Sequence, residues 1–360
     1  MKPRFKKKVK LIDIASKAGV SIGTASRVLN GKTDVNPELV GLVQNAAKTL
    51  GYFSSDSSKK IKSSPKSAMG TVGYLVDLQE QSGGVIFGDS FQQGFLEGID
   101  QEVSRCQGNV LFSSCRDDIE NGRLPAFISD RSVMGVVLKI GSNVSLDWIQ
   151  KIQQRVPLVM VMSREPSHSV SSVMCDNFNG VYQALCYLKS LGHRSIGFMA
   201  DRYQGIPQTV HHMEREEAFR RLIPLLGLNE DPQLIQVVVR DSQKETLNEV
   251  METGLNRLLA LKSKRPTAIL CAADVYAFAL MQVAASKGIS IPKDLSLIGF
   301  MNTDLAQHSN PALTSVSLSE FEIGRAAVDL LQYQMENPEG KVRHLTVGTS
   351  LIERKSCAKL

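Results

Sequence analysis

The stretch from Val9 to Asn30, VKLIDIASKAGVSIGTASRVLN, constrains the fold of this 360-residue chain more than any other segment. Its first half predicts a short helix whose apolar face consists of Leu11, Ile14, Ala15 and Ala18. Gly19 follows where that helix must end, because glycine readily takes the left-handed backbone that ends many helices. A tight turn is therefore expected at this glycine.

A second short helix is predicted over Ile22–Leu29, with the Ser21 hydroxyl capping its first turn. The residues expected to face the first helix are Ala25, Val28 and Leu29. The residues left pointing outward are Ile22, Gly23, Ser26 and Arg27. Small polar side chains and an arginine on this exposed face indicate a helix-turn-helix that places its second helix in the DNA major groove.

A third helix is expected between Asn36, its cap, and Gly51, just beyond its end, with Pro37 at the first helical position. Its apolar stripe would be Leu39, Leu42, Val43, Ala46 and Leu50. Residues 1–52 are therefore predicted to form a three-helix DNA-binding domain. Residues 53–70 are rich in serine and lysine, which predicts a linker.

The distribution of charge supports contact with nucleic acid. Residues 1–66 hold 14 Lys and Arg against 4 Asp and Glu, a formal charge of +10, whereas the rest of the chain carries −4. Basic charge confined to a small N-terminal region is typical of phosphate binding, although the lysines alone could form a solvated tail.

Six cysteines occur, without a CxxC pair or a metal-ligand spacing with histidine. This fits reduced thiols in a cytoplasmic protein. The N-terminus lacks the apolar core of a signal peptide, and no apolar run approaches the length of a membrane span. We therefore expect a cytoplasmic protein with no membrane partner and no cofactor.

From Thr71 onward, apolar strand candidates alternate with amphipathic helix candidates, which indicates α/β structure with parallel sheets covered on both faces. The strands are expected at 71–76, 110–113, 135–139, 158–162, 195–199, 235–239, 268–272 and 295–300. The helices are expected at 91–105, 180–191, 214–226, 246–261, 276–287 and 320–335. About 290 residues of this pattern predict two doubly wound lobes, with a ligand site between them.

Several stretches together resemble the lac repressor (LacI/GalR) family of bacterial transcription regulators. They are DIASKAGVSIGTASRVLNG (13–31), LGY (50–52), DNFNGVYQALCYLKSLGHRSIGFMA (176–200), REEAFRRL (215–222), PTAILCAAD (266–274), ISIPKDLSLIGF (289–300) and LIERKSC (351–357). The resemblance implies a core (71–360) like periplasmic sugar-binding proteins. It implies chain crossings between the lobes near Cys175, Met301 and Thr346. Lobe one would comprise about 71–174 and 304–340, and lobe two about 175–303 and 341–360.

The resemblance also assigns DNA contacts by position. Ile22, Gly23 and Arg27 match base-reading positions, and an arginine can donate two hydrogen bonds to guanine. The positions that match backbone contacts are Ser21, Thr24 and Asn30. Gly23 departs from the pattern, since it has no side chain with which to read a base.

The linker resembles the hinge helix of the family, which forms on the operator and inserts an apolar side chain into the minor groove. Ile61 stands at the inserting position. Ser54 replaces a usual proline, and the serine-rich stretch disfavours a helix, so a plain tether is the alternative.

For effector binding, Arg215 matches a family arginine that contacts ligand hydroxyls or carboxylates. The alternative is a solvated charge among Glu214, Glu216 and Glu217. Phe91 and Asp241 are further candidates for this site. The pair His211-His212 is also considered, although we expect it on a loop surface.

Other positions expected to contact the effector depart from the family pattern. Ala273 replaces the asparagine that usually precedes Asp274, Met301-Asn302 replace two aspartates, and Ser163 stands where an aspartate is common. We retain Asp274, Asn302 and Ser163 as candidates. A sugar or sugar derivative is expected, and an anionic or heterocyclic metabolite, or no effector, remains open.

These observations predict a homodimeric repressor that reads a pseudo-palindromic operator and responds to a small-molecule effector. A cytoplasmic receptor without DNA function is the alternative. An enzyme is not expected, because the sequence shows no Walker loop, GxSxG motif or metal-ligand cluster.

Overall fold

The computed structural model describes residues 11–29, 36, 39–43, 46, 69–77, 90–140, 144–164, 167–204, 210–241 and 244–360. The chain divides into two compact units, residues 1–65 and 66–360. Each unit is described by itself below.

In the N-terminal unit, helices α1 (Leu11–Ala18) and α2 (Ile22–Leu29) lie where the sequence predicts them. A small core buries Ile14, Ala15, Ala25, Val28, Val43 and Ala46. Residues 39–43 and 46 are helical, which confirms a third helical segment. Leu42 is wrongly placed in the predicted apolar stripe, since its side chain is 52% exposed.

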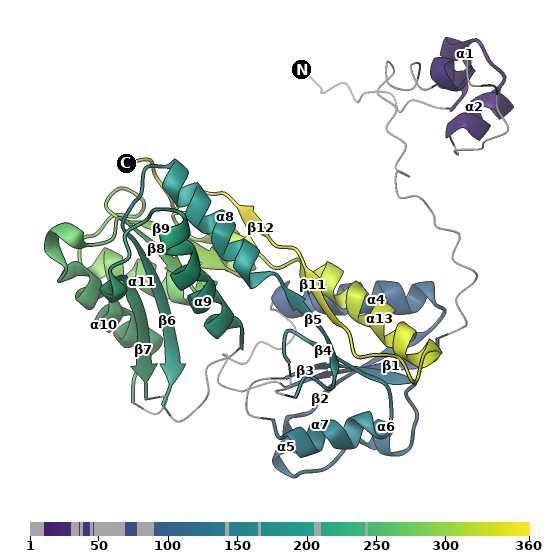
Figure 1. The fold of residues 1–360 in the computed structure, drawn as a ribbon, viewed down its shortest axis with the longest axis horizontal. Coiled ribbons are helices and arrows are strands. Elements are labelled where there is room, and N and C mark those ends of the chain that lie inside the picture. Colours follow the sequence, from purple (N-terminus) through teal and green to yellow (C-terminus); the bar gives the residue numbers. More distant parts are fainter. Residues whose placement is uncertain are drawn as a thin grey trace. The chain divides into compact units, whose positions relative to one another are not determined.

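The larger unit contains two six-stranded sheets, one in each lobe (Figure 1). The sheet of the first lobe has the order β11-β5-β4-β3-β1-β2, and all its neighbouring strands are parallel. Its strands are β1 (Thr71–Val76), β2 (Asn109–Ser114), β3 (Gly135–Lys139), β4 (Leu158–Val161), β5 (Ser171–Cys175) and β11 (His344–Val347). The helices of this lobe are α4 (Ser90–Arg105), α5 (Arg116–Glu120), α6 (Ala126–Ser129), α7 (Leu146–Gln153) and α13 (Glu320–Glu336).

The sheet of the second lobe has the order β12-β10-β9-β8-β6-β7 and is parallel except where β12 pairs with β10. Its strands are β6 (Ile196–Tyr203), β7 (Ile235–Arg240), β8 (Ala268–Cys271), β9 (Ser296–Phe300), β10 (Thr314–Ser317) and β12 (Ser350–Ile352). Its helices are α8 (Asn177–Ser190), α9 (Val210–Leu225), α10 (Leu247–Leu259), α11 (Asp274–Ser286) and α12 (Asp304–His308). Short 3-10 turns at Pro232–Leu234 and Lys262–Lys264 precede β7 and β8, respectively. Two doubly wound lobes are therefore confirmed.

The second crossing between the lobes differs from its expected place near Met301. Strand β10 pairs with β9, so residues 304–317 extend the sheet of the second lobe instead of starting the return to the first. The chain returns at 318–319, and β11 then pairs with β5 in the first lobe. The predicted boundaries failed here because α12 and β10 are too short to give a periodic signal.

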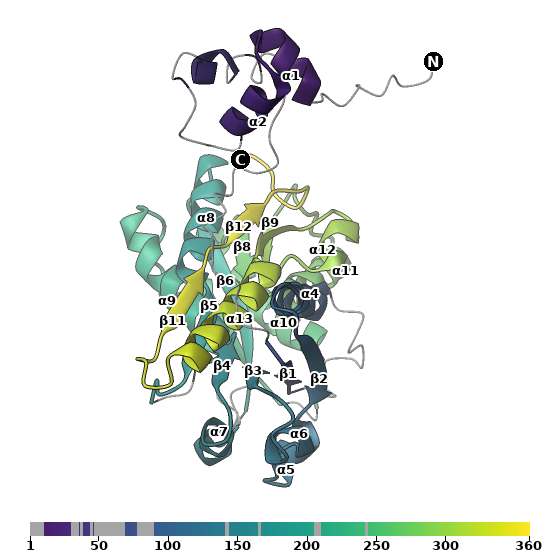
Figure 2. The same cartoon turned by 90° about the vertical axis from the view of Figure 1, so that its right-hand side faces the viewer.

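Helix α13 packs beside α4 in the first lobe, as both views show (Figures 1 and 2). The two backbones approach so closely that a Cβ atom at Gly98 would lie 2.1 Å from the carbonyl oxygen of Phe321. A Cβ atom at Gly324 would lie 2.4 Å from the carbonyl oxygen of Phe95. Only glycine fits at these two positions.

The three crossing segments are hydrogen-bonded to one another. The amide of Asp176 donates to the carbonyl oxygen of Val347 at 2.8 Å, and the Thr349 hydroxyl donates to the carbonyl oxygen of Asp176 at 3.1 Å. The Ser319 hydroxyl donates to the carbonyl oxygen of Gly348 at 2.9 Å. The hinge between the lobes therefore consists of three chain segments that are hydrogen-bonded to one another.

Candidate functional site

The turn between α1 and α2 has the geometry that the sequence predicts. Gly19 has a φ of +67°, and the Val20 amide donates to the carbonyl oxygen of Ala15 at 3.0 Å. The next residue, Ser21, accepts a hydrogen bond on Oγ from the Thr24 amide at 3.0 Å and so caps α2. The left-handed glycine and the serine cap fix the direction of the second helix.

The outer face of α2 carries an exposed arginine beside an exposed glycine. A Cβ atom at Gly23 would lie 3.7 Å from Ser21 Oγ and 3.9 Å from Arg27 Nη2, so these two side chains flank the glycine. Thr24 is half-buried on the same turn. The side chain of Ile22, and the whole of Asn30 and Ile61, lie outside the described residues.

Arg215 of α9 is the largest fully buried side chain of the chain as described, with 2% exposure. Its Nε donates to Asn177 Oδ1 at 2.8 Å and its Nη1 donates to the carbonyl oxygen of Ala272 at 2.6 Å. The guanidinium carbon lies 4.0 Å from the centre of the Phe300 ring. The alternative of a solvated surface charge is therefore wrong.

Burial lowers the pKa of the Arg215 guanidinium, and Cys175 and Asp274 partly offset this effect. No carboxylate among the described residues lies within salt-bridge distance of Arg215. The nearest link to a carboxylate runs through Asn177, whose Nδ2 donates to Glu214 Oε2 at 2.6 Å. A buried cation with this environment retains donor capacity for a ligand.

Asp274, a predicted effector contact, is hydrogen-bonded to two other segments of the second lobe. Its side chain is completely buried, Oδ2 accepts from the Thr303 amide at 2.7 Å, and Oδ1 accepts from the Ser315 hydroxyl at 2.6 Å. Burial raises the pKa of this carboxyl to about 6. Asp274 thus fixes the segment after β9, and both of its oxygens are engaged.

The other effector candidates are dispersed. Asn302 Oδ1 accepts from Arg354 Nη2 at 2.6 Å, and Ser163 is buried at the end of β4. Asp241 is half-buried in the turn after β7, and its Oδ2 lies 3.7 Å from Lys244 Nζ. The side chain of Phe91 lies outside the described residues. The hydrogen bonds described for Asn302 and Ser163 do not involve Arg215.

The two adjacent histidines lie in the first turn of α9 and not on a surface loop. His211 Nε2 donates to the carbonyl oxygen of Met162, so this bond joins the second lobe to the first. His212 Nδ1 lies 3.4 Å from Tyr276 Oη, which in turn donates to Asp201 Oδ1 at 2.7 Å. Burial, with Arg215 next in importance, lowers the pKa of each imidazole to about 3. The loop interpretation failed because the sequence places no apolar stripe at the start of α9.

The contact between the lobes adds two cations that sequence reasoning missed. Arg164 follows β4, and its Nη1 lies 4.0 Å from Glu214 Oε1. Lys139 ends the neighbouring strand β3, with its Nζ 5.7 Å from the centre of the Phe95 ring. Because ligands bind at the carboxyl ends of parallel strands, the residues directly after β3 and β4 were the available signal.

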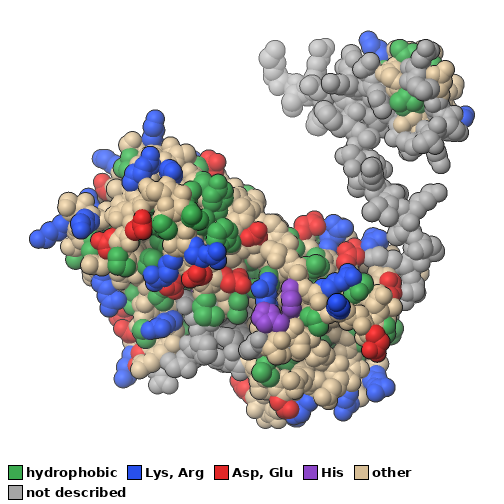
Figure 3. All heavy atoms as spheres, viewed as in Figure 1, with side chains coloured by type: hydrophobic (Ala, Val, Ile, Leu, Met, Phe, Trp, Pro, Cys, Tyr) green, Lys and Arg blue, Asp and Glu red, His purple; other side chains and the backbone are tan. Residues whose placement is uncertain are grey.

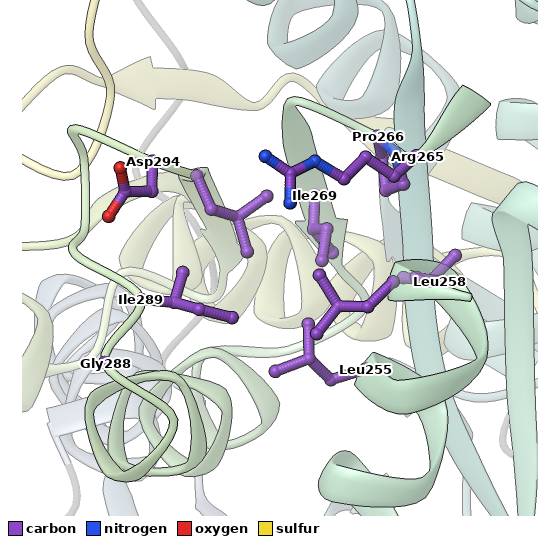
Figure 4. Close-up of a pocket in the computed structure, with 10 residues that line it drawn as sticks. Leu255, Leu258, Arg265, Pro266, Ile269, Gly288, Ile289 and Asp294 are labelled. Carbon is purple, nitrogen blue, oxygen red and sulfur yellow. The ribbon is translucent and has the colours of Figure 1, made fainter. Parts of the chain in front are cut away.

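A hollow of about 240 Å³ lies elsewhere on the second lobe, as Figure 4 shows. Leucine and isoleucine side chains, including Leu255 and Ile289, form its floor, with Arg265 and Asp294 at its rim. Pro266 and Leu295 precede β8 and β9, so the hollow opens at the amino ends of these strands. It is therefore distinct from the site around Arg215.

The surface and the thiols add no sign of another chemistry. Lys and Arg side chains mix with Asp and Glu over the core face in Figure 3. All six cysteines are free, and four of them are buried. Within the described residues no group of His, Cys, Asp and Glu could hold a metal ion, and every helix is too short or too polar to cross a bilayer.

Comparison with known families matches both units of the chain. Residues 10–55 match the family described as bacterial regulatory proteins, lacI family, and residues 185–357 match the periplasmic binding protein-like domain. The first match falls on the helix-turn-helix, and the second covers most of the second lobe together with α13 and β11 of the first.

The whole chain is also similar to characterised regulators. It is 28% identical to the HTH-type transcriptional repressor CytR of Escherichia coli K12, over 95% of this chain and 92% of that protein. It is 26% identical to the catabolite control protein A of Priestia megaterium, over 96% of both. The solved structure of a transcriptional regulator CelR–cellobiose complex superposes with a TM-score of 0.66 at 27% identity, over 97% of this chain and 99% of that one.

A capped helix-turn-helix joined to a bilobal binding core defines a DNA-binding transcription regulator with an effector-binding core. The chain belongs to the lacI family of bacterial regulatory proteins.

Proposed function

We propose that this regulator represses transcription from a pseudo-palindromic operator as a homodimer, and that an effector bound between the lobes of its core controls this binding. The observation that carries the proposal is the capped helix α2, which presents Arg27 on an exposed face. A two-fold dimer would match two symmetric half-sites of the operator. Acting on chromosomal DNA, the protein would work in the cytoplasm.

On DNA, Arg27 would read a guanine, because its guanidinium can donate to O6 and N7 together. Ile22 would contact a thymine methyl group, and Gly23 would let the helix approach the bases closely. Ser21, Thr24 and Asn30 would contact the DNA backbone at the start and end of the helix. Ile61 would insert into the minor groove at the centre of the operator.

In the core, Arg215 would be the principal effector contact, and the hinge between the lobes would transmit the effect of binding. A ligand alters DNA affinity only if it binds one arrangement of the lobes more tightly than another. A sugar or sugar derivative is one class of effector, since the similar CelR structure is a cellobiose complex. The role is that of a ligand-responsive switch and not of an enzyme.

A gel-shift experiment with the DNA upstream of its own gene tests the proposal. The full chain should shift this fragment in the presence of excess bulk competitor, and Arg27→Gln should weaken binding about tenfold or more. Arg155→Gln, which removes an exposed arginine of the core, is the matched control and should bind normally. A wild-type protein that prefers no promoter fragment over competitor would support the receptor without DNA function.

A further inference from the structure

The contact between the lobes gathers positive side chains around the start of α9. Arg215 and His211 lie one turn apart on this helix, and His211 is bonded to the carbonyl oxygen of Met162. Arg164 follows two residues after Met162 and approaches Glu214 of the same helix. Both lobes therefore supply cations to one region.

Two buried nitrogen atoms in this region have no hydrogen-bond partner. They are His211 Nδ1 and Arg164 Nε. Unpaired buried polar atoms destabilise a fold, and native proteins rarely leave them without water or ligand. These atoms come from opposite lobes. Arg164 Nε is a donor and His211 Nδ1 is an acceptor, because Nε2 carries the imidazole proton, so a ligand between the lobes would bond the first through an oxygen and the second through a hydroxyl.

The charge of the region selects the kind of group. Arg215 is buried and has no carboxylate within salt-bridge distance among the described residues, and Glu214 is shared between Asn177 and Arg164. Lys139, at the end of β3, adds another cation. Its charge contributes to lowering the pKa of His211, so the two side chains are near each other. Buried cations are normally paired with an anion.

The usual acidic groups of a sugar site do not occupy these positions. Met301 is not acidic, Ala273 has no polar side chain, and both oxygens of Asp274 accept hydrogen bonds from Thr303 and Ser315. A region with Arg164, Arg215 and Lys139 against the single carboxylate of Glu214 suits a ligand that accepts hydrogen bonds and carries negative charge.

Resting on the proposed function, we infer that the effector of this regulator is anionic and that Arg164, Arg215 and Lys139 bind its phosphate or carboxylate group between the lobes. Arg215 supplies the donors that its bonds to Asn177 and Ala272 leave, and Lys139 supplies a compact charge. The group would bond donors from both lobes and so stabilise their approach. The site would therefore select an anion over a neutral sugar by its charge and not by its size.

The test uses the full-length protein and two matched pairs of probes, ribose 5-phosphate with ribose and glucuronate with glucose. Binding is measured by titration calorimetry and by the shift in melting temperature at constant ionic strength. At least one charged probe should bind about tenfold or more tightly than its neutral parent. A preference confined to the phosphate pair or to the glucuronate pair identifies which anion the site takes.

The variants Lys139→Gln and Arg164→Gln should each weaken binding of the charged probe about tenfold, whereas Lys151→Gln, on an exposed face of α7, should not. Equal effects of charged and neutral probes, including no effect of either, would overturn the inference. So would a charged probe whose affinity survives both substitutions. Gel shifts of the same proteins without probe report separately whether the proposed DNA function holds.

Discussion

His211 donates a hydrogen bond from Nε2 to the main-chain carbonyl oxygen of Met162 and thereby links helix α9 of the second lobe to the end of β4 in the first. The carbonyl can only accept, so Nε2 carries the proton and the bond survives only in this tautomer or in the charged imidazole. Arg215 lies one turn away and opposes a second positive charge at this place. In the folded protein this imidazole is therefore neutral near pH 7, with its proton on Nε2.

The first prediction concerns pH. Since the pKa of His211 falls from 6.5 to about 3 on folding, the unfolded chain binds more protons below pH 6.5. The stability supplied by the neutral imidazole is present above that pH and is lost as the pH falls, by about 1 kcal/mol near pH 5.5. Denaturant unfolding followed by circular dichroism gives the free energy of unfolding at each pH. Below pH 6.5 this free energy should fall less steeply for His211→Asn than for the wild type.

His308→Asn is the control for this experiment, because His308 is exposed on α12. Its free energy of unfolding should fall as steeply as that of the wild type. An unchanged slope in His211→Asn would mean that the imidazole is not desolvated in the folded protein.

Asp274 should give a pH dependence of opposite sign. Its pKa rises from 3.8 to about 6 on folding, so its contribution is full below pH 3.8 and declines as the pH rises through 6. The ionised carboxylate is disfavoured by about 2–3 kcal/mol above that range. Asp274→Asn keeps an oxygen acceptor for Thr303, and its amide can donate to Ser315. The free energy of unfolding of the variant, relative to that of the wild type, should therefore increase between pH 4 and 6. A difference that stays constant over this range would contradict the argument.

The cap of α2 can be separated from its contact with DNA. Ser21→Ala removes the acceptor for the Thr24 amide and should destabilise the N-terminal unit by about 1 kcal/mol. Ser21→Asp keeps the cap but adds a negative charge where phosphates are expected. Hydrogen exchange of α2 should be faster only in the alanine variant, while gel shifts should show weaker DNA binding in both. Normal DNA binding by Ser21→Asp would place the phosphates elsewhere.

Sequence reasoning located the elements that have a strong local signal. Gly19 and Ser21 mark the turn and the cap because each acts on its own backbone neighbours. The long strands and helices of the core carry apolar periodicity and were found within a few residues, whereas β5, β10, β11 and β12 were missed. Strand β11 illustrates the reason, since its residues are mostly exposed at a sheet edge and give no buried run.

The interior of the site was harder to predict, because it depends on distant partners. Asp274 was read as a ligand contact, yet Thr303 and Ser315 reach it only after β9 and β10 are in place. In the sequence, Lys139 and Arg164 cannot be distinguished from ordinary surface cations. They come close to the contact between the lobes only because β3 and β4 are neighbours in the sheet. Arg215 is identified by its resemblance to a family position, but its burial against Phe300 could not be predicted from the three glutamates around it in the sequence.

The final prediction concerns Gly23, which the fold of the N-terminal unit does not require. A Cβ atom there would meet nothing closer than 3.7 Å, so Gly23→Ala should be accommodated and should stabilise α2 by up to about 1 kcal/mol. If the glycine allows close approach to the bases, the same change should weaken operator binding. Gly41→Ala is a matched control, because Gly41 is an exposed helical glycine with no atom within 4 Å of the added Cβ. It should stabilise the unit without changing the gel shift. Equal operator affinity for both alanine variants would show that side-chain size at position 23 does not limit the approach of α2 to DNA.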